Sequence, residues 1–314
     1  MAGGQLAVLE SPAAPSRWTL RTVGLRLFRR NPWRHPWILE TATWCYLVWS
    51  LVPIALAVLF SFNAGKSQSV WQGFSMRWYT GDPTGSVLHN PQLHQAVLQT
   101  IWLSLYTTLI TVPIGVAFGI GIDRWRSRAS STFNFVMIFT FVVPELIFGV
   151  ALFFVFTTLF KAIGLGTLAE VLGLVTWNLS WPAIIIRARL VTIGKQYEEA
   201  AADLGASRLA ALRRVLLPML MPAIFASAVL VFAGVVDDFV VVDLLSSTGN
   251  TQPMSVIIYS NTHGGNGGPA LNALATLMLV LSFVVATLGF VAYRWMTRGE
   301  RVGRQQAMAA FAGV

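Results

Sequence analysis

Residues 196–218 read QYEEAAADLGASRLAALRRVLLP and form a polar, patterned insert in a chain that is otherwise rich in apolar residues. The pattern is E-A-A-x3-G-x9-V-x-L-P, and its fixed positions are Glu199, Ala200, Ala201, Gly205, Val215, Leu217 and Pro218. Apolar segments precede and follow it. A chain built for lipid rarely keeps such a segment unless it contacts something outside the bilayer, so the insert indicates a partner on one side of the membrane.

The composition is that of an integral membrane protein. Of the 314 residues, 55% are hydrophobic and only 11% are charged, whereas soluble domains carry about 25% charged residues. The mean hydropathy is +0.64, and the 12 Trp and 20 Phe are typical of proteins whose aromatic side chains gather at membrane interfaces. The single cysteine, Cys45, excludes an intrachain disulfide and a cysteine-rich metal site.

Six segments are apolar enough to cross a bilayer, which takes a helix of about 20 residues. They are Ile38–Phe62, Leu93–Ile122, Phe133–Phe160, Val171–Ile186, Pro218–Leu245 and Leu271–Trp295. The fourth is the weakest of these predictions, because it is short and interrupted by Asn178 and Pro182. The sequence therefore predicts an all-α membrane protein with six transmembrane helices.

Lysine and arginine residues divide unequally between the two sides of this topology. Nineteen lie on the side of the two termini, and three lie on the opposite side, namely Lys66, Arg77 and Lys161. Basic loops stay in the cytoplasm, so both termini and the insert are predicted to be cytoplasmic. The same distribution accounts for the net charge of +9 and argues against nucleic-acid binding.

This topology divides the chain into three parts. Residues 1–37 are predicted to be a basic cytoplasmic extension, residues 38–296 a six-helix transmembrane domain, and residues 297–314 a cytoplasmic tail. The basic leader is longer than that of a signal peptide, so the first helix is predicted to remain uncleaved. The stretch Arg17–Arg30 fits either an amphipathic helix on the membrane surface or a disordered tail.

The insert is predicted to form two short helices joined by a corner, within the loop 190–217. Alanine and glutamate favour a helix over residues 196–204. Gly205 ends that helix or permits a left-handed turn, and Ser207 can cap a second helix, Arg208–Leu216. The small alanine side chains would allow another surface to approach closely.

The insert resembles the E-A-A loop of permease subunits of binding-protein-dependent ABC importers, with Val215 where isoleucine is usual. The resemblance implies the type I importer permease fold, with coupling helices that dock into a cytoplasmic ATPase, in the bacterial cytoplasmic (inner) membrane. It implies as partners a second homologous permease subunit, a dimer of ATPase subunits, an extracytoplasmic substrate-binding protein and membrane lipid. The residues that it assigns to ATPase coupling are Glu199, Ala200, Ala201, Gly205 and Pro218.

Further segments are similar to the second permease subunit of spermidine/putrescine-type importers. They are Asp237-Asp238-Phe239-Val240, Asn272-Ala273-Leu274-Ala275-Thr276 and Pro144-Glu145. The likeness extends from Trp78 to Trp295 and leaves out the N-terminal extension. It implies that the solute is a polyamine or a related small cation.

Acidic residues within the predicted spans are candidates for the substrate path, because ionisable groups are costly in lipid. Glu145 lies near the middle of the third span, and Asp237 and Asp238 lie in the outer part of the fifth. These spans offer no basic partner, so a substrate bearing amines could supply the missing charge, which argues against sulfate or phosphate. Trp177, Phe239 and Tyr259 could add cation–π contacts. Alternatively, the acids bond backbone groups at kinks or polar groups of the partner permease.

Sequence motifs for ATP binding, metal binding and catalysis are absent. The chain has no G-x4-G-K-[ST] loop, no H-E-x-x-H and no G-x-S-x-G, and its four histidines are scattered. We therefore predict a non-catalytic subunit with no cofactor or metal of its own, the ATP and magnesium being bound by the partner ATPase. Three alternatives remain open: the same role for an amino-acid-like or other small organic solute, an ion-driven secondary transporter, and a membrane-embedded enzyme.

Overall fold

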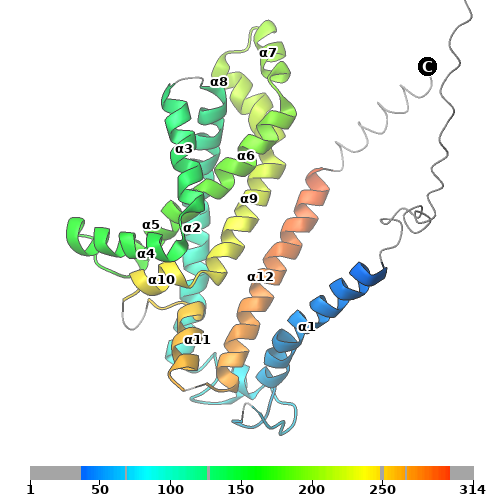
Figure 1. The fold of residues 1–314 in the computed structure, drawn as a ribbon, viewed down its shortest axis with the longest axis vertical. Coiled ribbons are helices and arrows are strands. Elements are labelled where there is room, and N and C mark those ends of the chain that lie inside the picture. The colour runs from blue at the N-terminus through cyan, green and yellow to red at the C-terminus, as the bar shows by residue number, and fades with distance from the viewer. Residues whose placement is uncertain (1–36, 68, 126–127, 248–250, 266, 298–314) are drawn as a thin grey trace, which may run out of the picture. The chain divides into compact units, whose positions relative to one another are not determined.

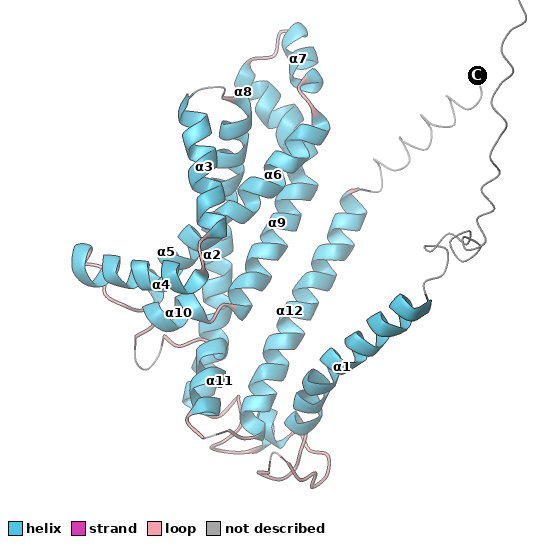
Figure 2. Ribbon diagram, viewed as in Figure 1, coloured by secondary structure: helices cyan, strands magenta, loops and turns pink. Residues whose placement is uncertain are grey.

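The computed structural model describes residues 37–67, 69–125, 128–247, 251–265 and 267–297 (Figure 1). In this part of the chain the regular structure is helical, apart from an isolated β-bridge between Asn63 and Phe74 (Figure 2). The chain divides into two units, Met1–Pro53 and Ile54–Val314. The predicted N-terminal extension with Arg17–Arg30, and the tail beyond residue 297, lie outside the described residues.

Five helices or joined helices are long and apolar enough to span a membrane. They are α1 (Trp37–Ser61), α2 (Pro91–Arg124), α5 (Thr167–Asn178) with α6 (Ser180–Ile193), α8 (Arg208–Ala211) with the π-helical turn η4 (Leu212–Leu216) and α9 (Leu217–Asp237), and α12 (Pro269–Met296). Their positions confirm the predicted first, second and sixth spans to within two residues at each end. The fourth is longer than predicted, because α5 and α6 together run from Thr167 to Ile193.

The prediction of a single helix for the third span, Phe133–Phe160, is wrong. The segment forms α3 (Arg128–Val142) and α4 (Glu145–Phe154), and the π-helical turn η3 (Val155–Leu159) extends α4. The two parts meet at an angle of 107°. Pro144 stands at the break, where it lacks an N–H to donate and its ring disfavours a continued helix. Counted as one broken span, the pair brings the candidate spans to six.

The predicted fifth span, Pro218–Leu245, is also wrong at its end. Helix α9 stops at Asp237, Asp238 is extended with ψ 124°, and the chain then turns into α10 (Val240–Leu245). Hydropathy missed this break because the residues after it are mostly apolar. The hydropathy of an apolar segment is the same whether the helix continues or ends and a new helix begins in another direction.

Helix α2 lies at the centre of the core of residues 54–297 and packs against α5, α6 and α9. Two glycines permit the close contact with α6. A Cβ atom added at Gly115 would lie 2.4 Å from Pro182 Cγ, and one added at Gly119 would lie 2.9 Å from the Ala183 carbonyl oxygen. Small residues at such positions let two membrane helices approach closely, so this pair fixes the separation of α2 and α6.

The remaining helical elements are short. They are η2 (Arg77–Gly81) in the loop between α1 and α2, α7 (Gln196–Asp203) after α6, and α11 (Met254–His263) before α12. In Figure 1, α4 and α5 run across the direction of α2 and α9. The break at Pro144 therefore turns the chain sideways before α6 resumes the long direction.

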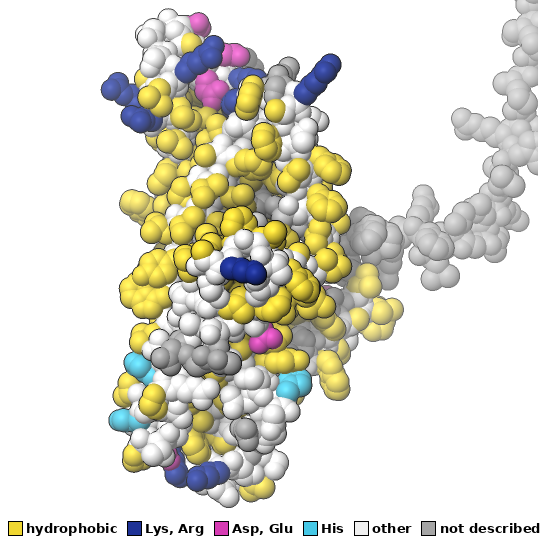
Figure 3. Space-filling model, turned by 90° about the vertical axis from the view of Figure 1, so that its left-hand side faces the viewer, with side chains coloured by type: hydrophobic (Ala, Val, Ile, Leu, Met, Phe, Trp, Pro, Cys, Tyr) yellow, Lys and Arg dark blue, Asp and Glu magenta, His cyan; other side chains and the backbone are white. Residues whose placement is uncertain are grey.

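Basic side chains gather at the end of the molecule that carries α7, next to a broad hydrophobic belt (Figure 3). The exposed residues of this end include Lys195, Arg208, Arg213 and Arg214. Because basic loops stay on the cytoplasmic side, the distribution agrees with a cytoplasmic insert. The direction in which the chain crosses the membrane stays a prediction.

Candidate functional site

A cavity of about 510 Å³ lies where the two helix breaks meet. One break separates α3 from α4 at Pro144, and the other separates α9 from α10 at Asp238. Helices α4 and α10 pack against each other, and Gly149 of α4 makes room for the Leu244 side chain, which would lie 2.8 Å from an added Cβ. Because the joined helices α5 and α6 also line the space, three separate stretches of chain form it. We call it the acidic cavity.

Three carboxyl groups line the acidic cavity, and each stands at a helix end. Glu145 is the first residue of α4, Asp237 is the last residue of α9, and Asp238 follows it in the break. Asp237 is exposed, Glu145 is half-buried, and Asp238 is only 8% exposed. The three side chains therefore offer both an accessible and a shielded negative group.

The position of Asp238 is fixed by bonds to two other elements. The Ser255 hydroxyl of α11 donates to its carbonyl oxygen at 2.7 Å, and the backbone N–H of Val242 donates to its Oδ1 at 3.4 Å. The second bond satisfies an N–H in the first turn of α10, as a capping residue does. Asp238 thus has a structural role in shaping the break as well as a place in the cavity wall.

The carboxyl groups of Glu145 and Asp238 lie close enough to share a hydrogen bond. No lysine or arginine is among the cavity-lining residues. Two ionised carboxylates at this separation repel each other, so the pair is stable with a proton or a cationic group between them. The cavity is therefore suited to a positively charged ligand.

Aromatic rings supply the rest of the wall. Trp177 and Trp181 line the cavity from the α5–α6 segment, and Phe239 lines it from the break. Trp177 packs on Phe148 of α4, with ring centroids 5.2 Å apart. The faces of aromatic rings attract cations, so these side chains complement the carboxyl groups.

Four of the five residues predicted for the substrate path line this cavity together, namely Glu145, Trp177, Asp237 and Asp238. The fifth, Tyr259 of α11, does not line it. Its ring packs against Phe239 at a tilt, with ring centroids 4.2 Å apart, so it contacts a residue of the cavity wall. The structure shows that these residues lie together, and their roles in binding a solute stay predictions.

Among the lining residues that the sequence did not assign to the substrate path, two carry a polar side-chain group, Asn178 and Trp181. In the sequence Asn178 only interrupts the predicted fourth span, yet it lines the cavity while its Nδ2 donates to the Leu174 carbonyl oxygen at 2.9 Å. A polar side chain within an apolar span was the signal that could have identified it. Nothing in the sequence distinguished Trp181 from a tryptophan that anchors the membrane interface.

The E-A-A residues form the exposed helix α7 at the opposite end of α6. Glu199, Ala200, Gly205 and Pro218 are exposed, and Ala201 is half-buried. Two predicted details are confirmed. Gly205 has a left-handed backbone with φ +82°, and the Ser207 hydroxyl accepts a hydrogen bond from the Ala210 N–H at 3.3 Å.

The predicted second helix of the insert, Arg208–Leu216, does not end there. Helix α8 continues through η4 into α9, so that Arg208–Asp237 is one helix of 30 residues. The corner before it carries Leu204, which is 91% exposed, beside the half-exposed Tyr197 and Leu209. Apolar side chains so exposed at a polar end of the molecule are typical of an interaction surface.

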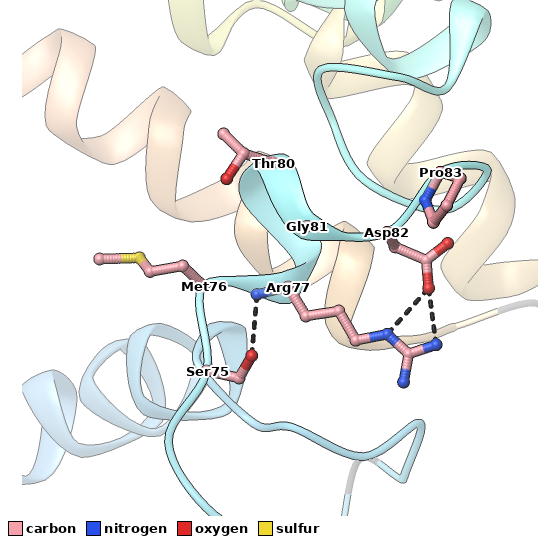
Figure 4. Close-up of a pocket in the computed structure, with 7 residues that line it drawn as sticks. All are labelled: Ser75, Met76, Arg77, Thr80, Gly81, Asp82 and Pro83. Carbon is pink, nitrogen blue, oxygen red and sulfur yellow. Dashed lines mark hydrogen bonds and ion pairs between the residues drawn. The ribbon is translucent and has the colours of Figure 1, made fainter.

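A second cavity, of about 540 Å³, lies at η2 in the loop between α1 and α2 (Figure 4). Arg77 contacts Asp82 there, with Nη2 to Oδ2 at 2.6 Å, and the N–H groups of Thr84 and Gly85 donate to Oδ1. The Arg77 guanidinium, followed by these N–H groups, holds the pKa of Asp82 well below its usual range. The two charges compensate each other, so this arrangement stabilises the loop.

Metal-ligating side chains do not cluster in the part of the chain that the structure describes. There, no group of three or more His, Cys, Asp or Glu residues could hold a metal ion. The acidic cavity has three carboxyl groups, of which Glu145 and Asp238 interact with each other.

Known proteins resemble this chain over most of its length. Residues 111–302 match the family described as "Binding-protein-dependent transport system inner membrane component". The chain is 33% identical over 277 residues to the putrescine transport system permease protein PotI of Escherichia coli (strain K12), covering 87% of this chain and 93% of the relative. It is 29% identical over 260 residues to the spermidine/putrescine transport system permease protein PotC of the same strain, covering 83% and 94%.

Solved structures share the fold. A chain of a bacterial ABC transporter involved in the import of the acidic polysaccharide alginate aligns with a TM-score of 0.67 at 17% identity, covering 87% of this chain and 100% of that one. A chain of the inward-facing MetNI methionine ABC transporter aligns with a TM-score of 0.51 at 19% identity, covering 66% and 95%. This protein is a multi-pass ABC importer permease of the bacterial inner membrane, and it belongs to the family of binding-protein-dependent transport system inner membrane components.

Proposed function

We propose that this chain is the permease subunit of an importer for polyamines such as putrescine and spermidine, or for closely related small organic cations. The observation that carries the proposal is the acidic cavity, where three carboxyl groups meet without a basic partner among the lining residues. The names of the relatives PotI and PotC agree with a polyamine cargo.

The chemistry of the cavity favours an alkylammonium over an anion. Ammonium groups donate charge-assisted hydrogen bonds to carboxylates, and the rings of Trp177 and Phe239 add cation–π attraction. A sulfate, phosphate or carboxylate ligand would be repelled by the same three groups. A diamine could place one ammonium between Glu145 and Asp238 and the other near the exposed Asp237.

Transport by this subunit needs partners that bind ATP and deliver the solute. We propose that a cytoplasmic ATPase dimer, which binds ATP and Mg²⁺, docks on α7 and the adjoining part of the insert, through Glu199, Ala200, Ala201, Gly205 and Pro218. A second homologous permease completes the path, and an extracytoplasmic binding protein delivers the cation. The exposed residues of the insert and the apolar corner at Leu204 support this docking surface.

The two helix breaks suit a solute path that opens and closes. Breaks at binding sites leave backbone groups and acidic side chains free for the solute, and the short helices α4 and α10 can move as a unit because they pack on each other. Binding of ATP and arrival of the loaded binding protein would favour the same conformation. The cavity would then alternate in access between the two sides of the membrane.

The proposal is tested with the importer complex reconstituted in liposomes, with radiolabelled putrescine as the probe. Asp237→Asn and Asp238→Asn should each lower uptake about ten-fold, because a hydrogen bond to a charged group contributes roughly 1.5–3 kcal/mol. Asn keeps an acceptor for the Val242 N–H, so the α10 cap survives in the second variant. Asp243→Asn is the matched control, since Asp243 is an exposed residue of α10 that does not line the cavity.

Three results would contradict the proposal or part of it. If both cavity variants transport as well as the Asp243 control, the acids are structural and do not bind solute. If lysine or arginine competes with uptake better than spermidine does, the cargo is an amino-acid-like cation. A complex purified without any ATPase would count against the importer mechanism itself.

A further inference from the structure

We propose that Arg124 is a positioning residue that locks the coupling helix α7 to α2 and transmits the movement of the ATPase into the core. The inference rests on the proposed function, because it needs an ATPase that docks on α7. By sequence, Arg124 is one of the nineteen basic residues on the side predicted to be cytoplasmic. Its contacts in the structure distinguish it from the others.

Arg124 is the last residue of α2, and its guanidinium reaches three neighbours. Its Nε lies 3.0 Å and 3.2 Å from the two carboxylate oxygens of Glu198, in the first turn of α7. Its Nη2 donates to the Gly194 carbonyl oxygen at 3.1 Å, and its Nη1 contacts Asp123. Every nitrogen of the side chain is therefore engaged.

These contacts hold the joint between α6 and α7. Gly194 ends α6 with a left-handed backbone, φ +73°, and Glu198 lies four residues further on. Arg124 and Glu198 are 19% and 24% exposed at their side chains, so solvent screens the pair less than it screens a pair on an open surface. A planar guanidinium that binds a carboxylate and a main-chain carbonyl together fixes an orientation.

The adjacent residues Glu198 and Glu199 differ in their surroundings and in their proposed roles. Glu198 is half-buried and turned toward Arg124, whereas Glu199 is exposed. Glu199 belongs to the E-A-A pattern and is free to meet a partner. Glu198 stands outside that pattern and binds within the chain.

Helix α2 links this joint to the far end of the molecule. Near its start, Gln99 Nε2 donates to Glu170 Oε2 at 2.9 Å, which attaches α5. The Thr100 hydroxyl accepts from the Met254 N–H at 2.9 Å, which attaches the start of α11. Since α5 carries Trp177 and Asn178 of the acidic cavity, α2 connects the coupling helix to the cavity wall through side-chain contacts at both ends.

The alternative route is the covalent chain, through α6 on one side of α7 and α8 on the other. If movement travelled only along the chain, loss of the Arg124 contacts would leave coupling intact. If the ATPase moves α2 through Arg124, loss of the Arg124 contacts should leave ATPase docking intact. It should weaken the stimulation of ATP hydrolysis and the uptake of putrescine. The two routes thus predict different outcomes for the same variants.

The test uses the complete importer in liposomes, with Arg124→Gln, Glu198→Gln, and the reversed pair Arg124→Glu with Glu198→Arg. Three quantities are measured: the amount of ATPase that copurifies, the stimulation of ATP hydrolysis by the putrescine-loaded binding protein, and putrescine uptake. We expect unchanged copurification and a loss of stimulation and uptake of about five-fold in each single variant, as for a modest coupling free energy. The reversed pair should recover at least half of the loss.

Arg128→Gln is the matched control, because Arg128 is an exposed arginine at the same end of the molecule. The inference would be overturned if the single variants kept the stimulation and uptake of this control. It would also be overturned if the reversed pair showed no more stimulation or uptake than the single variants. Loss of copurifying ATPase in Arg124→Lys, which keeps the charge, would also overturn it, since Arg124 would then build the docking surface. A wild-type complex that lacks ATPase would instead overturn the proposed function.

Discussion

Helix α6 joins the two proposed functional regions, which are built in different ways. Trp181 in its first turn lines the acidic cavity, and Gly194 after its last turn leads into α7. The proposed coupling residues come from one continuous stretch, residues 199–218, whereas the cavity residues come from three stretches between residues 145 and 240. A surface for a partner protein can be encoded locally. A cavity in the membrane depends on where distant helices break.

The two regions also differ in what a single change should do. In the coupling region, exposed residues depend on backbone conformation at one corner. In the cavity, side chains depend on the packing of α2, α5 and α9 around them. Backbone changes should therefore act most strongly on the first region and packing changes on the second.

Gly205→Pro should have the largest effect, abolishing putrescine uptake while the protein still reaches the membrane. Proline fixes φ near −65° and has no N–H, whereas Gly205 has φ +82° and donates to the Ala202 carbonyl oxygen at 2.8 Å. Gly205→Ala should be intermediate, because a left-handed alanine costs about 1–2 kcal/mol. Uptake is measured per amount of protein in the membrane.

Gly268→Ala is the control for this prediction. Gly268 also has open space around it, but its φ of −166° is one that alanine adopts readily. Full uptake by the proline variant at normal membrane levels would show that the corner at Gly205 does not transmit movement.

Gly119→Ala should act on the packing of α2 against α6, and so lower the stability of the fold. An added Cβ would lie 2.9 Å from the Ala183 carbonyl oxygen and 3.3 Å from Ile186, and forced separation of packed helices typically costs about 1–3 kcal/mol. Gly121→Ala is the matched control, because nothing lies within 4 Å of its added Cβ. Thermal unfolding in detergent should show a lower midpoint for the first variant alone. Equal midpoints would mean that the α2–α6 contact is looser than the structure indicates.

The sequence predicted most of the local structure of the insert, but the arrangement of the cavity only in part. Alanine, glutamate, Gly205 and Ser207 act through local rules of helix formation and capping, so α7, the left-handed corner and the cap could be predicted residue by residue. The unbroken run from α8 into α9 could not, since Pro218 lies within the first two residues of α9, directly after the π-helical turn η4, and does not end the helix there.

For the cavity, the acids could be found because charge in an apolar segment is rare. Their meeting could not be predicted, because it depends on the breaks at Pro144 and Asp238 and on the contact of α4 with α10. Hydropathy averages over about one span and is blind to a 107° turn within it. For the same reason, the sequence could not show that Tyr259 contacts the lining residue Phe239 and does not itself line the cavity.

Asn178→Leu should have a smaller effect, confined to the cavity. Leucine keeps the branched shape and the number of heavy atoms of asparagine, and the site opens onto the cavity, so packing around α5 should change little, but the polar group on the wall is lost. We expect an apparent KM for putrescine that is raised about three- to ten-fold, in keeping with one lost hydrogen bond of roughly 1 kcal/mol, and an unchanged basal rate of ATP hydrolysis. Leu230→Met, a volume-conserving change on the same wall, is the control. An unaltered KM would remove Asn178 from the solute path.

The smallest effect is expected at Asp82, away from both regions. Because Arg77 and the N–H groups of Gly85 and Thr84 lower its pKa in the folded chain, ionised Asp82 stabilises the loop above its unfolded pKa of about 4. That contribution is lost as the pH falls below about 4 toward the folded pKa. Hydrogen exchange of residues 75–88 should therefore accelerate between pH 5 and pH 3, after correction for intrinsic rates, in the wild type. In Asp82→Asn the corrected rates should be nearly independent of pH, and an equal acceleration in the variant would assign the pH dependence to another group.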